Sequence, residues 1–272
     1  MARQKAENKM VPAGNGAKLA LGVTPTKMDF AALQSADFAA QLSYVLKENM
    51  GTNVAPFDFD ELQIPSGSTA APAWTVPGLE GAVSVPEVCG ILVFKQNVRE
   101  FYEGEFDGSA TPPTCFSPDA CEGFGKPGGD CSTCPFGQWG SGRDAKGNPT
   151  KGKACAERIH ALLLPEDSYL PYFVNFPPTS KKAVADYCMR LVAKGRLYNS
   201  VVTRLALEPA KSSTGIAYCK AVLTMEGALT DEGAAMAKAY GDALGSIITA
   251  RRAEDARRRT AGEKTTEGAA SQ

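Results

Sequence analysis

The sequence predicts a mixed, β-rich α+β fold: a small antiparallel barrel with one long inserted loop and flanking helices. Apolar runs typical of strands recur between residues 57 and 225, and a single helical segment interrupts them. No strand–helix unit repeats, as a doubly wound parallel sheet would require. Residues 104–152 are rich in Gly, Pro, Asp and Cys and nearly lack aliphatic side chains. A feature other than an apolar core must therefore organise this long segment.

The N-terminal part of the chain offers few long elements. Residues 1–27 are polar and lack periodicity, which predicts a flexible arm. In residues 37–50 apolar side chains recur at helical spacing, and Gly51 is placed to end that helix. The many prolines of residues 54–87 leave only short strands, such as 57–64. Residues 90–95 then form a compact apolar run that predicts a strand.

Regular patterns return beyond Cys155. Residues 158–164 and 170–176 are expected to be strands. Thr179 and Ser180 are placed to cap a helix that Gly195 ends.

The last part of the chain predicts a hairpin and a helix. Residues 200–208 and 215–225 alternate with period two and are separated by turn residues. An Ala-rich helix is expected over residues 228–259, followed by a polar tail at 260–272. The predicted domain therefore covers residues 28–227.

Composition excludes several function classes. The 272 residues hold 29 Lys and Arg against 30 Asp and Glu, so only the local distribution of charge can point to a nucleic-acid partner. The single histidine, His160, rules out zinc sites that need two imidazoles. No apolar run approaches the roughly 20 residues that span a bilayer. No apolar signal core follows the charged N-terminus, so a soluble, cytoplasmic protein without a membrane partner is expected.

The cysteines predict a structural zinc site in a loop at about residues 112–157. Cys131 and Cys134 form a C-x-x-C pair, and Cys115 and Cys155 complete a four-thiolate set for one Zn²⁺. Cys121 is an alternative to Cys115, which we prefer because it follows Pro112 and Pro113.

Other interpretations of these cysteines remain open to different degrees. A thioredoxin-like pair would begin a helix, whereas Gly, Asp and Pro flank this one. Zinc deaminases also need an H-x-E motif, and His160 has no such glutamate. Reduced, unliganded cysteines are the remaining alternative, but they would leave the long loop without an organising feature.

Eight sequence strings resemble a phage- and prophage-encoded family of single-stranded-DNA-binding proteins. They are FDFDELQIP (Phe57–Pro65), AWTVP (Ala73–Pro77), PPTCFSPD (Pro112–Asp119), CSTCP (Cys131–Pro135), WGSG (Trp139–Gly142), KGKAC (Lys151–Cys155), LPYFVNFPPTSK (Leu170–Lys181) and VVTRL (Val201–Leu205). The resemblance covers roughly residues 55–227. It implies an oligonucleotide-binding (OB) barrel with an inserted zinc loop, and zinc ligands at the four preferred cysteines. It also implies a role in phage DNA replication or recombination in the host cytoplasm, beside other proteins of those processes.

Single-strand binding needs a cationic track and exposed aromatic faces. Basic side chains dominate residues 143–158 and 181–204, and aromatic side chains accompany both stretches. The predicted DNA contacts are Trp139, Arg143, Lys151, Lys153, Arg158, Tyr172, Lys182, Tyr198, Arg204 and Tyr218. The competing interpretations are that the cations neutralise the zinc thiolates or form a solvated helix face, and that the strand aromatics belong to the core. We expect His160 to be a buried structural residue.

Three function classes follow. The first is a non-catalytic protein that protects single-stranded DNA and presents it to other enzymes. The second is a zinc-ribbon adaptor that contacts a polymerase or duplex DNA. The third is a nuclease, which is disfavoured because no spaced carboxylate motif for Mg²⁺ is evident.

Overall fold

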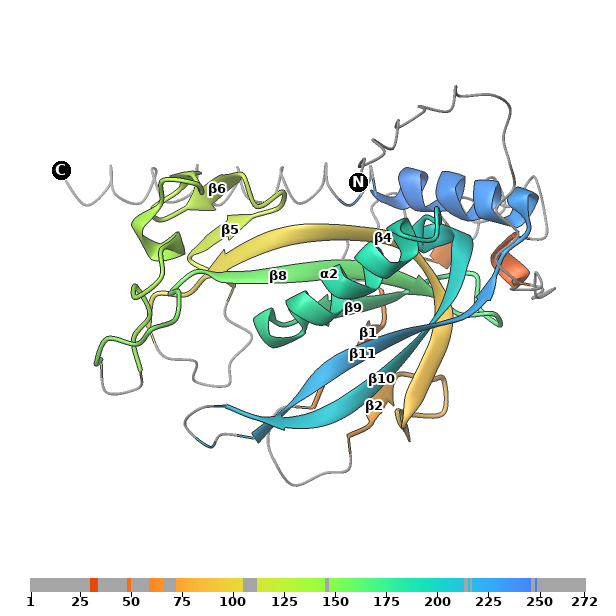
Figure 1. Cartoon of the computed structure of the whole chain (residues 1–272), viewed down its shortest axis with the longest axis horizontal. Coiled ribbons are helices and arrows are strands. Elements are labelled where there is room, and N and C mark those ends of the chain that lie inside the picture. Colours follow the sequence, from red (N-terminus) through yellow and green to blue (C-terminus); the bar gives the residue numbers. More distant parts are fainter. Residues whose placement is uncertain are drawn as a thin grey trace, which may run out of the picture.

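The computed structural model describes residues 30–33, 48–49, 59–65, 72–104, 112–144, 147–212, 215, 217–245 and 248, and confirms a sheet-rich α+β fold (Figure 1). The strands are β1 (Glu61–Leu62), β2 (Trp74–Val76), β3 (Val83–Val85), β4 (Glu87–Phe101), β5 (Cys115–Ser117), β6 (Glu122–Gly125), β7 (Gly129–Asp130), β8 (Ala156–Leu164), β9 (Tyr172–Phe176), β10 (Val201–Lys211) and β11 (Ala217–Ala228). The helical elements are η1 (Ala31–Leu33), η3 (Pro135–Gly137), α2 (Pro178–Val192), η4 (Tyr198–Ser200) and a C-terminal helix over residues 231–245.

The main sheet is open. Its strand order is β1-β9-β8-β4-β5-β6-β7, and the β10–β11 hairpin joins it through β4. The β1–β9 pair is parallel, and the other pairs are antiparallel. Among the described strands no pairing closes the sheet into the expected barrel, because β1 occupies the outer edge of β9 and β11 pairs only with β10.

Strand β4 is the longest strand and pairs with three others. Its first residues pair with β10, its middle with β8 and its last residues with β5. It bends strongly between these partners (Figure 1). Gly90 lies in the part that pairs with β10, and a Cβ there would lie 2.5 Å from the Leu164 carbonyl oxygen, so only glycine allows this close approach.

Two apolar cores lie on opposite faces of the sheet. One joins strands β4, β8, β9, β10 and β11 to the buried stripe of α2, which is formed by Val184, Tyr187 and Leu191. The other lies between the sheet and the C-terminal helix. That helix packs closely on β4, since a Cβ at Gly241 would lie 1.8 Å from the Val93 carbonyl oxygen. We call β4, β8–β11 and α2 the sheet body.

The start of α2 differs from the prediction. The helix carries the expected apolar stripe, but its N-cap is Pro177 and no side chain caps it. Ser180 is fully buried, and its hydroxyl accepts a hydrogen bond from the Ala221 amide of β11 instead (2.9 Å). The serine therefore fixes the helix to the sheet rather than capping it.

Several other boundaries also differ. Strand β4 is much longer than the expected run 90–95, and β1 is shorter than 57–64. The three-residue strands β2 and β3 fit the expectation that the prolines of residues 54–87 leave only short strands, although their positions were not named in advance. The expected arm at 1–27 and tail at 260–272 lie outside the described residues, as do most of the expected helix at 37–50 and residues 249–259 of the C-terminal helix.

The expected zinc loop is built of short elements. Residues 112–155, which we call the cysteine region, contain β5, β6, β7 and η3. They extend one end of the sheet beyond β4, at the end away from the C-terminal helix (Figure 1).

Candidate functional site

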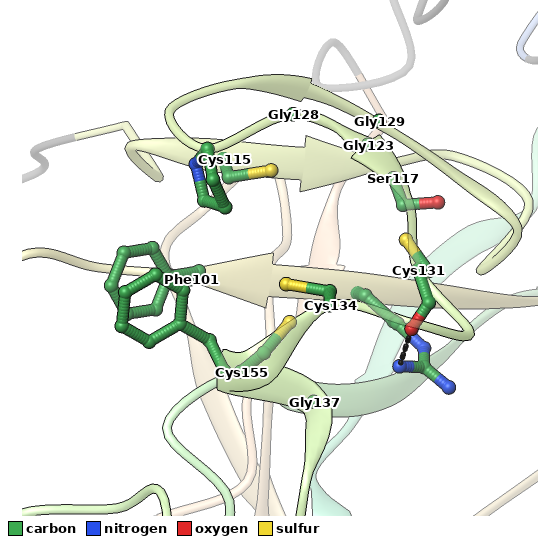
Figure 2. A pocket seen from close by; sticks show the side chains of 13 residues that line it. Phe101, Cys115, Ser117, Gly123, Gly128, Gly129, Cys131, Cys134, Gly137 and Cys155 are labelled. Carbon is green, nitrogen blue, oxygen red and sulfur yellow. Dashed lines mark hydrogen bonds between the residues drawn. The ribbon is translucent and has the colours of Figure 1, made fainter.

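Four cysteines from separate elements line one small cavity. Cys115 lies on β5, Cys131 directly follows β7, Cys134 precedes η3, and Cys155 precedes β8. The cavity has a volume of about 10 Å³, and the four side chains surround it (Figure 2). Cys121 is exposed and does not line it. The structure thus brings together the preferred set and leaves the alternative cysteine outside.

Local sequence explains why the cysteines can approach. A Cβ at Gly123 would lie 2.9 Å from Cys115 Sγ and 3.7 Å from Cys131 Sγ, so glycine leaves room for both sulfur atoms. The Cys131 amide donates a hydrogen bond to the Cys121 carbonyl (2.8 Å). The Asp119 carboxylate accepts hydrogen bonds from the amides of Cys121 and Glu122. Backbone and turn hydrogen bonds thus shape a region that has little apolar core.

Burial favours the neutral form of three of the four thiols. Burial raises the pKa of Cys115, Cys131 and Cys155, the last to about 12, and neighbouring cysteines add to the shift. A cation would offset this effect, because metal ligation requires thiolates and releases their protons.

The donor set suits zinc by its chemistry, since four cysteine sulfurs are a common closed zinc shell. A tetrahedral shell with Zn–S bonds of about 2.3 Å would bring the sulfurs within about 4 Å of one another. Within the described residues, no three His, Cys, Asp or Glu side chains are already arranged to hold a metal ion. The four thiols are therefore neighbours around one cavity without forming a finished coordination shell.

A chain of polar contacts leads from the cavity to the surface. Arg99 donates a hydrogen bond to the Cys131 carbonyl (3.1 Å), and its guanidinium lies 3.3 Å from the Glu157 carboxylate. Glu157 also binds Lys153 (2.7 Å) and Lys181. These two lysines lower the pKa of Glu157 to about 2. One carboxylate thus holds three cations next to the cysteine region.

Trp139 stands at the outer end of this chain. Trp139 is 79% exposed, and Lys153 Nζ lies over its indole ring, 5.1 Å from the ring centroid. Lys153 therefore contacts both Glu157 and Trp139. The aromatic face is presented to solvent by glycine-rich backbone on both sides.

An open hollow of about 1050 Å³ lies beside the cysteine region. It gathers three of the predicted cations, Arg143, Lys153 and Arg158, with Tyr102 and Phe136. Three carboxylates also line it: Glu100, Glu103 and Asp144. Arg158 is paired with Glu100 (2.9 Å), which reduces its share of the positive charge.

The other predicted DNA contacts lie elsewhere. Lys151 is exposed in the cysteine region. Lys182 pairs with Asp186 along α2 (2.6 Å), and Arg204 lies between Glu87 and Glu226. The three tyrosines do not line the hollow: Tyr172 and Tyr198 pack against the apolar core, and Tyr218 is half-buried on β11.

His160 is buried at 3% exposure, as expected. Its Nε2 lies 3.4 Å from Glu100, and its ring packs against Phe116 and Phe173.

Sequence reasoning missed two residues of this area. Arg99 links the cysteine region to Glu157, and Tyr102 is an exposed aromatic at the rim of the hollow. The sequence indicated both only weakly, as an arginine and a tyrosine beside the acidic residues of positions 100–107.

Comparisons with protein-family models, with curated proteins and with solved structures found no match to this chain. In the part of the chain that the structure describes, no helix has the length and apolar character needed to cross a membrane.

Proposed function

We propose that this protein binds single-stranded DNA without catalysing a reaction, and that it protects the DNA and presents it to proteins of phage replication or recombination. The proposed place of action is the host cytoplasm, away from membranes. One observation carries the proposal: Lys153 lines the open hollow and also covers the exposed Trp139. A cation and an aromatic face therefore meet at the edge of a space large enough for nucleotides.

The connectivity of the sheet body supports an OB barrel that is partly open. Strands β4, β8 and β9 pair in succession, α2 follows, and the β10–β11 hairpin returns to β4. This order is compatible with a five-stranded OB fold that lacks its closing pair. OB folds bind oligonucleotides through their second and third strands and through the loops after strands one and four. Those places correspond here to β8, β9, the cysteine region and the connection between β10 and β11.

The chemistry of the cysteine region suits a strand of phosphates and bases. Base stacking on an aromatic side chain is tolerant of sequence, and nearby cations track the backbone. In the proposed complex Trp139 stacks on a base, and Lys153 leaves the indole ring to bind the adjacent phosphate. Arg143 and Lys151 are exposed and extend the cationic track. Glu157 keeps Lys153 beside Trp139 in the absence of DNA.

We further propose that Cys115, Cys131, Cys134 and Cys155 hold one structural Zn²⁺. When bound, the ion supplies a rigid cross-link between four segments and takes no part in a reaction. Arg99 would support it from outside the cavity by holding the Cys131 carbonyl.

Fluorescence titration of the full chain with oligo-dT and with duplex of equal length tests the function. We expect clear preference for the single strand. The variant Arg143→Ala/Lys153→Ala should bind oligo-dT at least tenfold more weakly. Lys182→Ala serves as a matched control, because Lys182 is paired with Asp186 and does not line the hollow. Equal affinity for duplex would favour the adaptor, and degradation of the oligonucleotide with Mg²⁺ would identify a nuclease.

A further inference from the structure

The end of α2 exposes large aliphatic side chains that the core does not use. Met189, Val192 and Leu197 are 66%, 65% and 59% exposed, whereas Tyr187 and Leu191 of the same segment are buried. Single exposed apolar residues are ordinary on a protein surface. Here three large apolar side chains are exposed within nine consecutive positions, although the helix already buries an apolar stripe on its other side.

Unpaired positive charge accompanies these side chains. Arg190, Lys194 and Arg196 lie in the same stretch, and the sequence contains no Asp or Glu between residues 187 and 207. In the described part of the chain no carboxylate pairs with any of the three. Cations are favourable near a helix C-terminus, but that effect does not account for exposed aliphatic side chains beside them. We call these six residues the α2 patch.

The chemistry of the α2 patch favours a protein segment over DNA. Single-strand binding sites use aromatic platforms, and the patch exposes none. The nearby Tyr198 packs against the core, with Lys95 Nζ 5.2 Å from its ring centroid. Interfaces between proteins commonly combine an apolar centre with a polar rim. Because every charged group of the patch is positive, the complementary surface is apolar and acidic.

We propose that the α2 patch docks a segment of a partner protein in which Asp or Glu residues accompany large apolar side chains. The patch lies at the opposite end of α2 from the cysteine region (Figure 1). Lys181, which binds Glu157, precedes Val192 by three helical turns, or about 16 Å at 1.5 Å per residue. A partner at the patch would leave the hollow and Trp139 accessible, so the docking does not depend on the proposed DNA site.

Fluorescence anisotropy with three labelled ten-residue peptides tests the proposal on the full chain. The first peptide alternates Asp with Leu, the second Lys with Leu, and the third Asp with Ser. We expect the Asp–Leu peptide to bind at least tenfold more tightly than either control peptide. Similar binding of all three, or none at all, would overturn the proposal.

Two surface variants locate the binding. Met189→Ser/Val192→Ser/Leu197→Ser removes the apolar part, and Arg190→Gln/Lys194→Gln/Arg196→Gln removes the charge. Each should weaken the Asp–Leu peptide at least tenfold while oligo-dT binding and circular dichroism stay unchanged. Lys182→Gln, on the same helix, is the matched control and should have no effect.

The remaining outcomes also decide the matter. Wild-type peptide binding by both variants would place the peptide elsewhere. Self-association that the apolar variant abolishes would assign the patch to a second copy of the chain. Loss of oligo-dT binding in the charge variant would overturn the docking proposal and make the patch part of the DNA track. The DNA site at the hollow would still be tested separately by the Arg143→Ala/Lys153→Ala variant.

Discussion

The sheet body and the cysteine region use different means to hold their shape. The body buries large side chains completely, such as Leu163, Val174 and Phe176. The cysteine region contains no Leu, Ile, Val or Met, and its structure depends on turns, glycines and short strands around four thiols. A metal ion can replace a core where apolar side chains are missing. The proposed binding surface therefore belongs to the region that has fewer buried apolar side chains to hold its shape.

The largest expected effect is on the free energy of unfolding, and it comes from a substitution in the sheet body. Phe176→Ala should lower the free energy of unfolding by about 3–5 kcal/mol, because the ring is fully buried in the main core. Urea denaturation followed by circular dichroism measures this. Because the cysteine region does not share the core around Phe176, we expect the folded variant to keep a normal zinc content. A folded variant without zinc would mean that the two regions are not separable.

The converse change is Cys155→Ser. Cys155 is buried at the cavity, so we expect loss of zinc and of order in residues 112–155 while the body stays folded. Mass spectrometry measures zinc in protein purified without added metal, and limited proteolysis maps the disordered segment. Cys121→Ser is the matched control and should change neither. Zinc-free wild-type protein with an ordered cysteine region would contradict the proposed metal role.

Trp139→Ala tests whether the cysteine region binds DNA through its exposed indole ring. If the ring stacks on a base, the substitution should weaken oligo-dT binding by about 1–3 kcal/mol without affecting stability. Tryptophan quenching in the wild type reports on the same contact. Trp74 is completely buried and hydrogen-bonded to the Leu205 carbonyl, so most of the quenching should come from Trp139. A Trp74→Phe background isolates the signal, and normal binding by Trp139→Ala would place the ring in a packing role.

The smallest expected effect is on salt dependence. For single strands, log K falls against log salt by about 0.7 per phosphate contact. Lys151→Ala/Lys153→Ala should therefore make the slope less steep by about 1.4. Arg204→Ala should leave it unchanged, because Glu87 and Glu226 already neutralise that arginine. A slope that responds to Arg204 and ignores the two lysines would move the DNA track from the cysteine region to the body.

Local patterns in the sequence were sufficient for some of these features. The periodic stripe of α2 and the apolar run of β8 were predictable because both depend on neighbouring residues. The four cysteines that line the cavity are the set preferred from the C-x-x-C pair, the prolines before Cys115 and the family resemblance, because spacing alone left Cys121 as an alternative. These are properties of short stretches of chain.

Contacts between distant segments were not predictable in the same way. Counting charges over residues 181–204 made Arg204 a candidate DNA contact, but its partner Glu87 lies 117 positions away. The link from Arg99 to Cys131 and Glu157 likewise depends on the pairing of β4 with its neighbours. The bend of β4 and the open edge of the sheet follow from such long-range packing.

The threefold pairing of β4 has a consequence for the order of folding. The contact between β4 and β10 joins segments more than a hundred residues apart, whereas β4, β5 and β6 are near neighbours in the chain. Bringing distant segments together slows folding, because the intervening chain loses entropy before the contact forms. During synthesis the cysteine region leaves the ribosome before β10 exists. If the proposed zinc binds, its thiol ligands would therefore meet it on a nascent chain whose main core is still incomplete.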